Sequence, residues 1–225
     1  MSPLTVACVL RSGGIYSEEW VYALKRGLSR YMPGRYRDPL SPPEPGTWTL
    51  RCLTDSKALG HMAIPLRHGW HGWWSKIELF RPGLFGTRVL YLDLDTLVVG
   101  DLTEVAALDV PFAMLSDFYR PEVAESGVMA WRPSPQTEAI YERFCEGPPR
   151  LIARYRGDGR FIREHVAHER LQDLVPGQIV SLKVHAKGGP PDGAALVCGH
   201  GTPRLNTRAA GWAHREWMSL SREAA

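Results

Sequence analysis

Runs of apolar residues recur along the chain and predict the strands of a buried sheet. The run from Val89 to Leu92 meets charged residues at both ends, which is typical of a strand covered on both faces. Further apolar segments predict strands at residues 4–10, 49–53, 63–66, 111–115, 126–131, 179–184 and 195–198. The expected fold class is therefore α/β, with a mixed, mostly parallel sheet flanked by helices.

Apolar residues at helical spacing predict helices between these strands. Trp20, Leu24 and Leu28 share one face of residues 18–31, a helix that Ser17 can cap. Shorter helices are expected at residues 73–80, 135–146, 151–155 and 161–165, and a short helix or a turn is expected at 101–108. The many prolines and glycines of residues 32–48 predict a surface loop.

The 225 residues fit a single domain, in which residues 205–225 form a helical tail. Trp212 and Trp217 give this tail an apolar side, which can pack on the domain or touch a membrane surface peripherally. We expect it to pack on the domain, because Glu216 and Glu223 dilute its positive charge. No apolar run is long enough for a membrane span, and we expect no signal peptide.

The net charge and the cysteines indicate which kinds of partner and which cellular location to expect. The formal net charge is +3 and the basic residues are scattered, so nucleic acid is not an expected partner. The four cysteines show no CxxC spacing and are expected to be reduced: Cys8, Cys52, Cys145 and Cys198. A cytoplasmic location is therefore expected.

Two aspartates follow the strand at residues 89–92. Asp93 and Asp95 are two residues apart on extended backbone, so both carboxylates leave the same face and can aim at one point. Because like charges repel, a cation is expected between them, and oxygen ligands suit Mg²⁺ or Mn²⁺ with a substrate phosphate. The same Asp-x-Asp pattern also occurs where aspartates only cap a turn. His200, in a Gly-His-Gly turn, is either a third ligand or a surface-loop histidine.

Five segments in order resemble the GT-A glycosyltransferases, and most closely the glycogenin-like family 8 enzymes. They are Trp74–Phe80, Arg88–Asp101, Ser126–Trp131, Gly157-Asp158 and His200–Arg204. The resemblance covers residues 6–204. It implies a GT-A fold and a retaining transfer of a hexose from a nucleotide-diphosphate sugar, expected to be a UDP-sugar, to a saccharide, lipid or protein acceptor.

The resemblance also implies a role for individual residues. The implied ligands of Mn²⁺ (or Mg²⁺) are Asp93, Asp95 and His200. The residues implied to lie near the donor diphosphate are Lys76, Arg204 and the neighbouring Gly201. Those implied to face the base and ribose are Leu10, Arg11 and Tyr16. Those implied to face the donor sugar are Ser126 and the candidate catalytic residues Asp117 and Asp158.

Three positions depart from the family pattern. Glu125 stands where many relatives have Asn, Gly159 replaces a Gln, and Leu205 replaces a Pro. The Gly159 departure removes an expected contact with the donor sugar. It therefore keeps open the alternative of a non-catalytic nucleotide-sugar-binding relative.

Two other enzyme classes share parts of the pattern. The segment 93–97 is close to the Asp-x-Asp-Gly-Thr-Leu motif of haloacid-dehalogenase phosphatases, but it lacks the glycine and lies far from the N-terminus. Residues 10–14 resemble the Gly-rich loop of sugar nucleotidyltransferases without the following Gly-Thr-Arg. Three nearby tryptophans could stack on an acceptor sugar: Trp70, Trp73 and Trp74. One of Trp73 and Trp74 is expected in the core instead, and Trp70 stays open.

Overall fold

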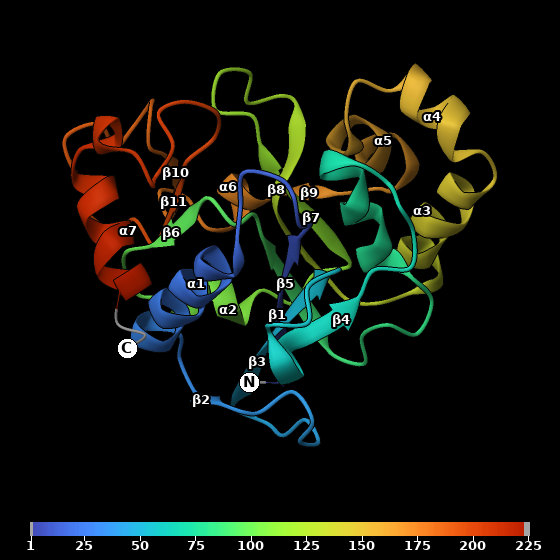
Figure 1. Cartoon of the computed structure of the whole chain (residues 1–225), viewed down its shortest axis with the longest axis horizontal. Helices are drawn as coiled ribbons and strands as arrows, with labels where there is room; N and C mark the ends of the chain where they lie inside the picture. The colour runs from blue at the N-terminus through green and yellow to red at the C-terminus, as the bar shows by residue number, and fades with distance from the viewer. Residues whose placement is uncertain (1, 223–225) are drawn as a thin grey trace.

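The computed structural model describes residues 2–222 and shows a central sheet between two helical layers (Figure 1). The main sheet has the order β2-β3-β1-β5-β8-β7-β9, and β4 pairs with β3. Its strands are β1 Leu4–Leu10, β2 Arg35–Tyr36, β3 Thr47–Thr54, β4 Ala63–Pro65, β5 Arg88–Leu92, β7 Phe112–Ser116, β8 Ala124–Trp131 and β9 Glu169–Arg170. Pairings with β8 are antiparallel and the others are parallel, so the predicted mixed, mostly parallel sheet is confirmed.

Helices cover both faces of this sheet. The α-helices are α1 Glu18–Tyr31, α2 Thr103–Ala107, α3 Pro135–Cys145, α4 Pro148–Arg154, α5 Asp158–His165, α6 Leu171–Leu174 and α7 Trp212–Arg222. The 3₁₀-helices are η1 Gly60–Met62, η2 Gly72–Phe80 and η3 Arg208–Ala210. In Figure 1, α1, α2 and α7 lie on one side, and η2, α3 and α5 lie on the other.

The alternation of side chains along β5 divides the core into two halves. Leu90 and Leu92 pack on the side of α1 and α7, whereas Val89 and Tyr91 pack on the side of η2, α3 and α5. All five residues of β5 are buried, as expected for a strand covered on both faces. The strand ends where this burial ends, at Asp93.

A second, small sheet brings the C-terminal part of the chain to the end of β5. It has the order β10-β11-β6, with β6 Thr96–Val98, β10 Ile179–Ser181 and β11 Leu196–Cys198. The backbone N–H of Gly199 donates to the carbonyl oxygen of Asp95 at 2.7 Å. This pairing places the Gly-His-Gly turn beside the two aspartates, although about 100 residues of sequence separate them.

Most elements form where the sequence predicts them. The strand at 4–10 and the helix at 18–31 have the predicted bounds, whereas residues 73–80 lie in a 3₁₀-helix rather than an α-helix. The helix expected at 151–155 begins earlier, at Pro148, because proline suits the first turn of a helix. The short strands β2, β6 and β9 were not predicted; β2 interrupts the loop expected at 32–48.

The C-terminal helix packs on the domain, as predicted. Trp217 is buried, and its ring lies 4.8 Å from that of Trp20 on α1. The indole N–H of Trp212 donates to the carbonyl oxygen of Ala186 at 2.6 Å. Residues 223–225 of the predicted tail lie outside the described residues. Among the described residues, no helix has the length and apolar character needed to cross a membrane, and the four cysteines are free thiols.

Replacing Ser134 with alanine is expected to lower the free energy of unfolding by about 1 kcal/mol. Ser134 caps α3: its hydroxyl accepts from the Thr137 N–H at 3.3 Å, and its own N–H donates to the Thr137 hydroxyl at 2.9 Å. Ser17, at the start of α1, makes no side-chain cap bond with any described residue. Chemical denaturation of the Ser17→Ala variant should therefore show a smaller loss, and equal losses would contradict the assigned cap.

Candidate functional site

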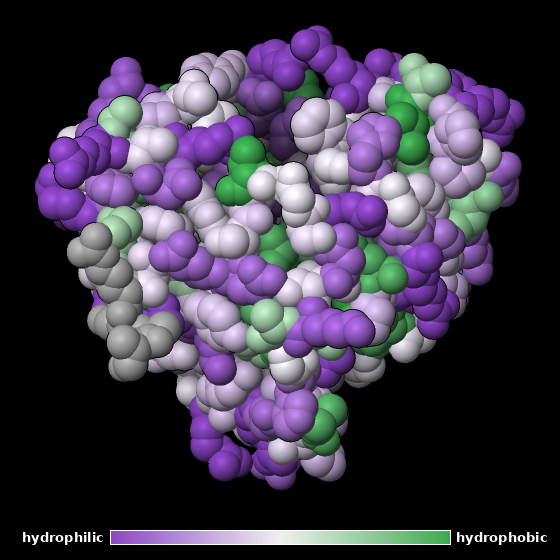
Figure 2. Space-filling model, in the orientation of Figure 1, coloured by the Kyte–Doolittle hydropathy of each residue, from purple (hydrophilic) through white to green (hydrophobic). Residues whose placement is uncertain are grey.

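A cavity of about 350 Å³ lies where β5, β7 and β8 meet the turn after β11. Figure 2 shows a hollow with a mostly hydrophilic surface near the top of the molecule, at the end of the sheet where β5 leads into the aspartates. Most of the sequence-predicted site residues line the cavity: Lys76, Asp93, Asp95, Asp117, Ser126, Asp158 and His200. The carboxyl edge of an α/β sheet is where ligands are expected to bind.

Asp93 and Asp95, the acidic pair, each accept a hydrogen bond from a tyrosine. The hydroxyl of Tyr91 donates to Asp93 Oδ1 at 2.5 Å, and that of Tyr16 donates to Asp95 Oδ2 at 2.9 Å. Burial, and next the negative charge of Asp93, raise the pKa of Asp95 to about 7. The two carboxylates are thus close enough to repel each other, which a cation between them would relieve.

His200 lines the same cavity but makes other contacts. Its Nε2 lies 2.7 Å from the hydroxyl oxygen of Ser181, and its ring stacks on Phe118 with 5.4 Å between centroids. Within residues 2–222, no group of three or more His, Cys, Asp or Glu side chains is arranged to hold a metal ion. Asp93 and Asp95 remain as two candidate ligands of a divalent cation, while His200 would have to exchange its Ser181 partner to become a third.

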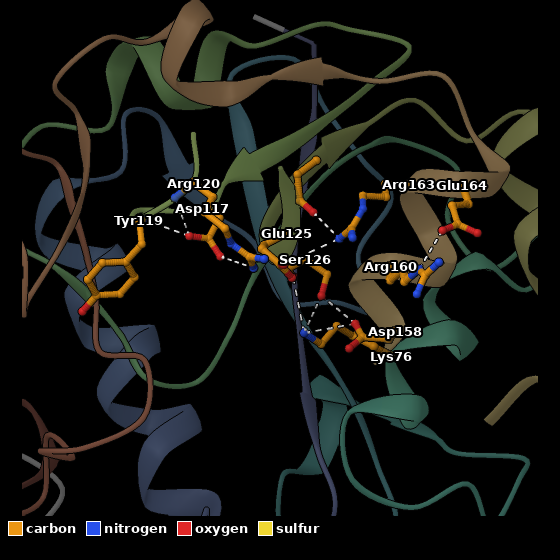
Figure 3. Close-up of polar contacts among 11 residues, drawn as sticks. Lys76, Asp117, Tyr119, Arg120, Glu125, Ser126, Asp158, Arg160, Arg163 and Glu164 are labelled. Atoms are coloured by element: carbon orange, nitrogen blue, oxygen red, sulfur yellow. Dashed lines mark hydrogen bonds and ion pairs between the residues drawn. The ribbon is translucent and has the colours of Figure 1, made fainter. Parts of the chain in front are cut away.

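Lys76 is buried at the centre of a polar network (Figure 3). It is 7% exposed, and its Nζ lies 3.0 Å from Asp93 Oδ1. On the side drawn in Figure 3, the Nζ lies 3.4 Å from Asp158 Oδ2. The Nζ also donates to the hydroxyl of Ser126 at 3.2 Å, and that hydroxyl donates to Asp158 at 2.6 Å. Burial alone would lower the pKa of Lys76, but the charges of Asp158 and Asp93 outweigh it and raise the pKa. Lys76 therefore joins the sugar-facing and metal-facing sides of the predicted site.

An irregularity in β8 aims Ser126 and Gly127 into the cavity. Met114 of β7 faces Met129, but the next residue, Leu115, faces Glu125, so the pairing skips residues 126–128. The carbonyl of Gly127 accepts instead from the Asp93 N–H at 2.9 Å. Such bulges re-aim side chains beside functional sites.

Asp117 lies in a tight turn on the cavity wall. Its Oδ1 accepts from the N–H groups of Tyr119 and Arg120 at 2.8 and 2.9 Å, and its Oδ2 lies 3.2 Å from the Arg120 guanidinium (Figure 3). Burial would raise the pKa of Asp117, but these hydrogen bonds outweigh it and lower the pKa. Asp117 is thus an ionised turn-capping carboxylate with a face toward the cavity.

The residues predicted to contact the nucleotide divide into two groups. Tyr16 and Arg204 meet at the acidic pair, since Arg204 donates to the Tyr16 hydroxyl at 3.5 Å. Arg11 donates instead to the carbonyl of His68 at 3.1 Å. Leu10 is a core residue with only 2% of its surface exposed, so the structure leaves it almost no surface that could face a ligand. Gly201 lies beside His200 with a φ of +71°, a conformation that favours glycine.

Sequence reasoning missed several residues at the site. Tyr91 could have been found, because it lies two residues before Asp93 and so leaves the same face. Ser181 and Lys183 carry no motif; the Lys183 Nζ would lie 3.1 Å from a Cβ placed on Gly201. Their position depends on the pairing of β10 with β11, which the sequence does not specify.

The three tryptophans before β5 have different environments. Trp74 is buried in the core, which confirms that one of Trp73 and Trp74 is a core residue. Trp73 is 58% exposed and lines the cavity. Trp70 stacks on His68 with ring centroids 4.1 Å apart, so one of its faces is already covered.

Solved structures of glycosyltransferases share this fold. GlyE of Streptococcus pneumoniae TIGR4 has a TM-score of 0.66 at 12% identity over 97% of this chain and 63% of its own. The galactosyltransferase LgtC, in complex with donor and acceptor sugar analogs, has a TM-score of 0.61 at 11% identity over 96% of this chain and 95% of its own. The bifunctional glycosyltransferase WbbM has a TM-score of 0.58 at 13% identity over 99% of this chain and 50% of its own.

These likenesses confirm the predicted GT-A type fold. The chain spans less than two thirds of the length of GlyE and nearly all of LgtC. No protein-family model matches the sequence, and no curated protein sequence matches it. Because identity is 11 to 13%, the structural likeness shows the fold and leaves the activity to be argued from the site.

Proposed function

We propose that the chain is a metal-dependent glycosyltransferase that moves a hexose from a nucleotide-diphosphate sugar, with UDP as the expected nucleotide, to an acceptor. The observation that carries the proposal is the pair Asp93 and Asp95, which lines the cavity after β5 in a GT-A fold. Tyr16 contacts Asp95, and Arg204 contacts Tyr16. In the solved LgtC complex, the same fold holds donor and acceptor sugar analogs.

The acidic pair would hold Mn²⁺ or Mg²⁺, and His200 remains the predicted third ligand. When bound, the cation offsets the negative charge that develops on the leaving diphosphate. Arg204 adds a fixed positive charge near the same place. Lys76 forms an ion pair with Asp93 at 3.0 Å and thereby holds this carboxylate in place as a ligand for the ion.

The wall of the cavity that contains Asp117, Ser126 and Asp158 would hold the donor sugar. Asp158 and Ser126 are fixed by Lys76, and Asp117 is fixed by its turn, so their oxygens accept hydrogen bonds from hydroxyl groups without rearrangement. We propose a retaining mechanism. A transfer that retains the anomeric configuration needs no strong base to activate the acceptor hydroxyl. Trp73 and Tyr119, both exposed at the cavity, offer aromatic faces to an acceptor saccharide.

Thermal unfolding with nucleotide diphosphates, in the presence and absence of MnCl₂, tests this function. UDP together with Mn²⁺ is expected to stabilise the chain by about 2–3 kcal/mol at 100 times its Kd, because only the folded state binds. UDP without metal should give a much smaller shift. Equal shifts with and without metal would contradict the assignment of the acidic pair as metal ligands.

Turnover separates the transferase from a non-catalytic binding protein. Incubation of the Mn²⁺-bound chain with UDP-glucose or UDP-galactose should release UDP slowly by hydrolysis, even without the acceptor. Binding of UDP without any such release would favour the non-catalytic alternative, which the Ser181 contact of His200 also favours.

A further inference from the structure

Glu125 faces the sugar side of the cavity from the irregular part of β8. It is the last residue of β8 to pair with β7 before the pairing skips residues 126–128, and it lines the cavity with Asp117 and Asp158. Its side chain is 38% exposed, and the nearest cation, Arg163, lies 3.5 Å away (Figure 3). The carboxylate therefore reaches the cavity with open hydrogen-bonding capacity.

Gly159 on α5 leaves the space that this carboxylate occupies. A Cβ built on Gly159 would lie 2.8 Å from Glu125 Oε2 and 3.3 Å from both the backbone nitrogen and the hydroxyl oxygen of Ser126. The first distance is shorter than real Cβ contacts, so any larger residue at 159 would displace the Glu125 side chain. Glu125 and Gly159, the two departures from the family pattern on this wall, thus fit each other.

The three carboxylates of this wall differ in how well their charges are offset. Asp158 has Lys76 at 3.4 Å and the Ser126 hydroxyl at 2.6 Å, and Asp117 accepts two backbone N–H groups and faces Arg120 at 3.2 Å. Within the part of the chain that the structure describes, Glu125 has only its longer ion pair with Arg163, whose NH1 also donates to the carbonyl of Ala124. Burial raises the pKa of Glu125, which agrees with a carboxylate whose charge is poorly compensated.

We propose that Glu125 determines which donor sugars the cavity accepts: its carboxylate accepts hydrogen bonds from the hydroxyl groups of a neutral hexose and repels a sugar that carries a carboxylate. The donor class is then a neutral hexose, and uronic acid donors are rejected. This inference rests on the proposed function, because it assumes that a nucleotide-diphosphate sugar occupies the cavity.

Matched donors that differ only at C6 test the inference. Kd values are measured by titration calorimetry with MnCl₂ for UDP, for UDP-glucose against UDP-glucuronate, and for UDP-galactose against UDP-galacturonate. The wild-type chain should bind at least one neutral donor about tenfold or more tightly than its uronate partner, as expected for two like charges at close range. Glu125→Gln, which keeps the shape, should reduce that ratio about tenfold and leave the Kd of UDP unchanged.

The experiment also needs a control variant and a statement of the results that would contradict the inference. Glu122→Gln removes an exposed glutamate and should leave every Kd unchanged. Equal wild-type affinity for both members of both donor pairs, or an unchanged ratio in Glu125→Gln, would overturn the inference while UDP still binds. Absence of UDP binding would reject the proposed function and the inference with it.

Gly159→Ala provides a second variant. It should raise the Kd of the neutral donor by displacing the Glu125 side chain, and an unchanged Kd would count against a contact between Glu125 and the donor sugar.

Discussion

Replacing Lys76 with methionine is expected to lower the free energy of unfolding by about 3 kcal/mol. The Nζ of Lys76 offsets the charges of Asp93 and Asp158, which lie 3.0 and 3.4 Å away in a region where Lys76 is 7% exposed. Methionine fills a similar volume but leaves both carboxylates without their cation. Because Asp93 is partly exposed, solvent screens some of its charge, which places the loss at the lower end of the usual range.

Chemical denaturation of three variants checks this expectation. Lys57→Met changes an exposed lysine and should shift the stability by no more than about 0.5 kcal/mol. The double variant Lys76→Met with Asp158→Asn removes one of the two uncompensated charges and should recover at least about 1 kcal/mol. If Lys76→Met is as stable as the wild type, the buried network does not depend on its positive charge.

The local part of the fold and of the site was predictable from the sequence. The bounds of α1 and β1 follow from the periodic apolar positions of one uninterrupted segment. Asp93 and Asp95 line one cavity as predicted, but the reason given for it was wrong, because residues 94–95 form a turn after β5 and not extended backbone. The helical region at 72–80 was located correctly, but its 3₁₀ geometry was not foreseen. Apolar spacing over so few residues does not distinguish the two helix types.

The remaining features depend on contacts between distant segments. The bond of His200 to Ser181 requires β10 to pair with β11, and the contact of Glu125 with Gly159 requires α5 to pack against β8. In the sequence, Glu125 and Gly159 appear as two separate departures from a family pattern. Only the structure shows that Gly159 leaves space for the Glu125 side chain. The missing contact expected from residue 159 is thereby replaced by a carboxylate that can select the donor sugar.

Replacing Asp95 with asparagine is expected to stabilise the metal-free chain while abolishing its Mn²⁺-dependent binding of UDP. Burial and the charge of Asp93 raise the pKa of Asp95 from 3.8 to about 7. Because the folded state then holds the proton more tightly than the unfolded state, ionising Asp95 costs stability as the pH rises from about 4 to about 7. With EDTA at pH 8, Asp95→Asn should gain about 1–2 kcal/mol, after allowance for solvent screening.

The same variant should bind UDP in MnCl₂ at least about 100-fold more weakly, since a neutral amide is a poor ligand for a hard divalent cation. Thermal unfolding at pH 4 and pH 8 with EDTA measures the first effect, which should vanish at pH 4. Asp192→Asn, which changes an exposed aspartate, should show neither effect. A stabilised variant that kept full Mn²⁺-dependent UDP binding would show that the repulsion at the end of β5 is real but serves no metal. A loss of stability at pH 8 would contradict the repulsion itself, because the removed charge would then have been favourable in the folded chain.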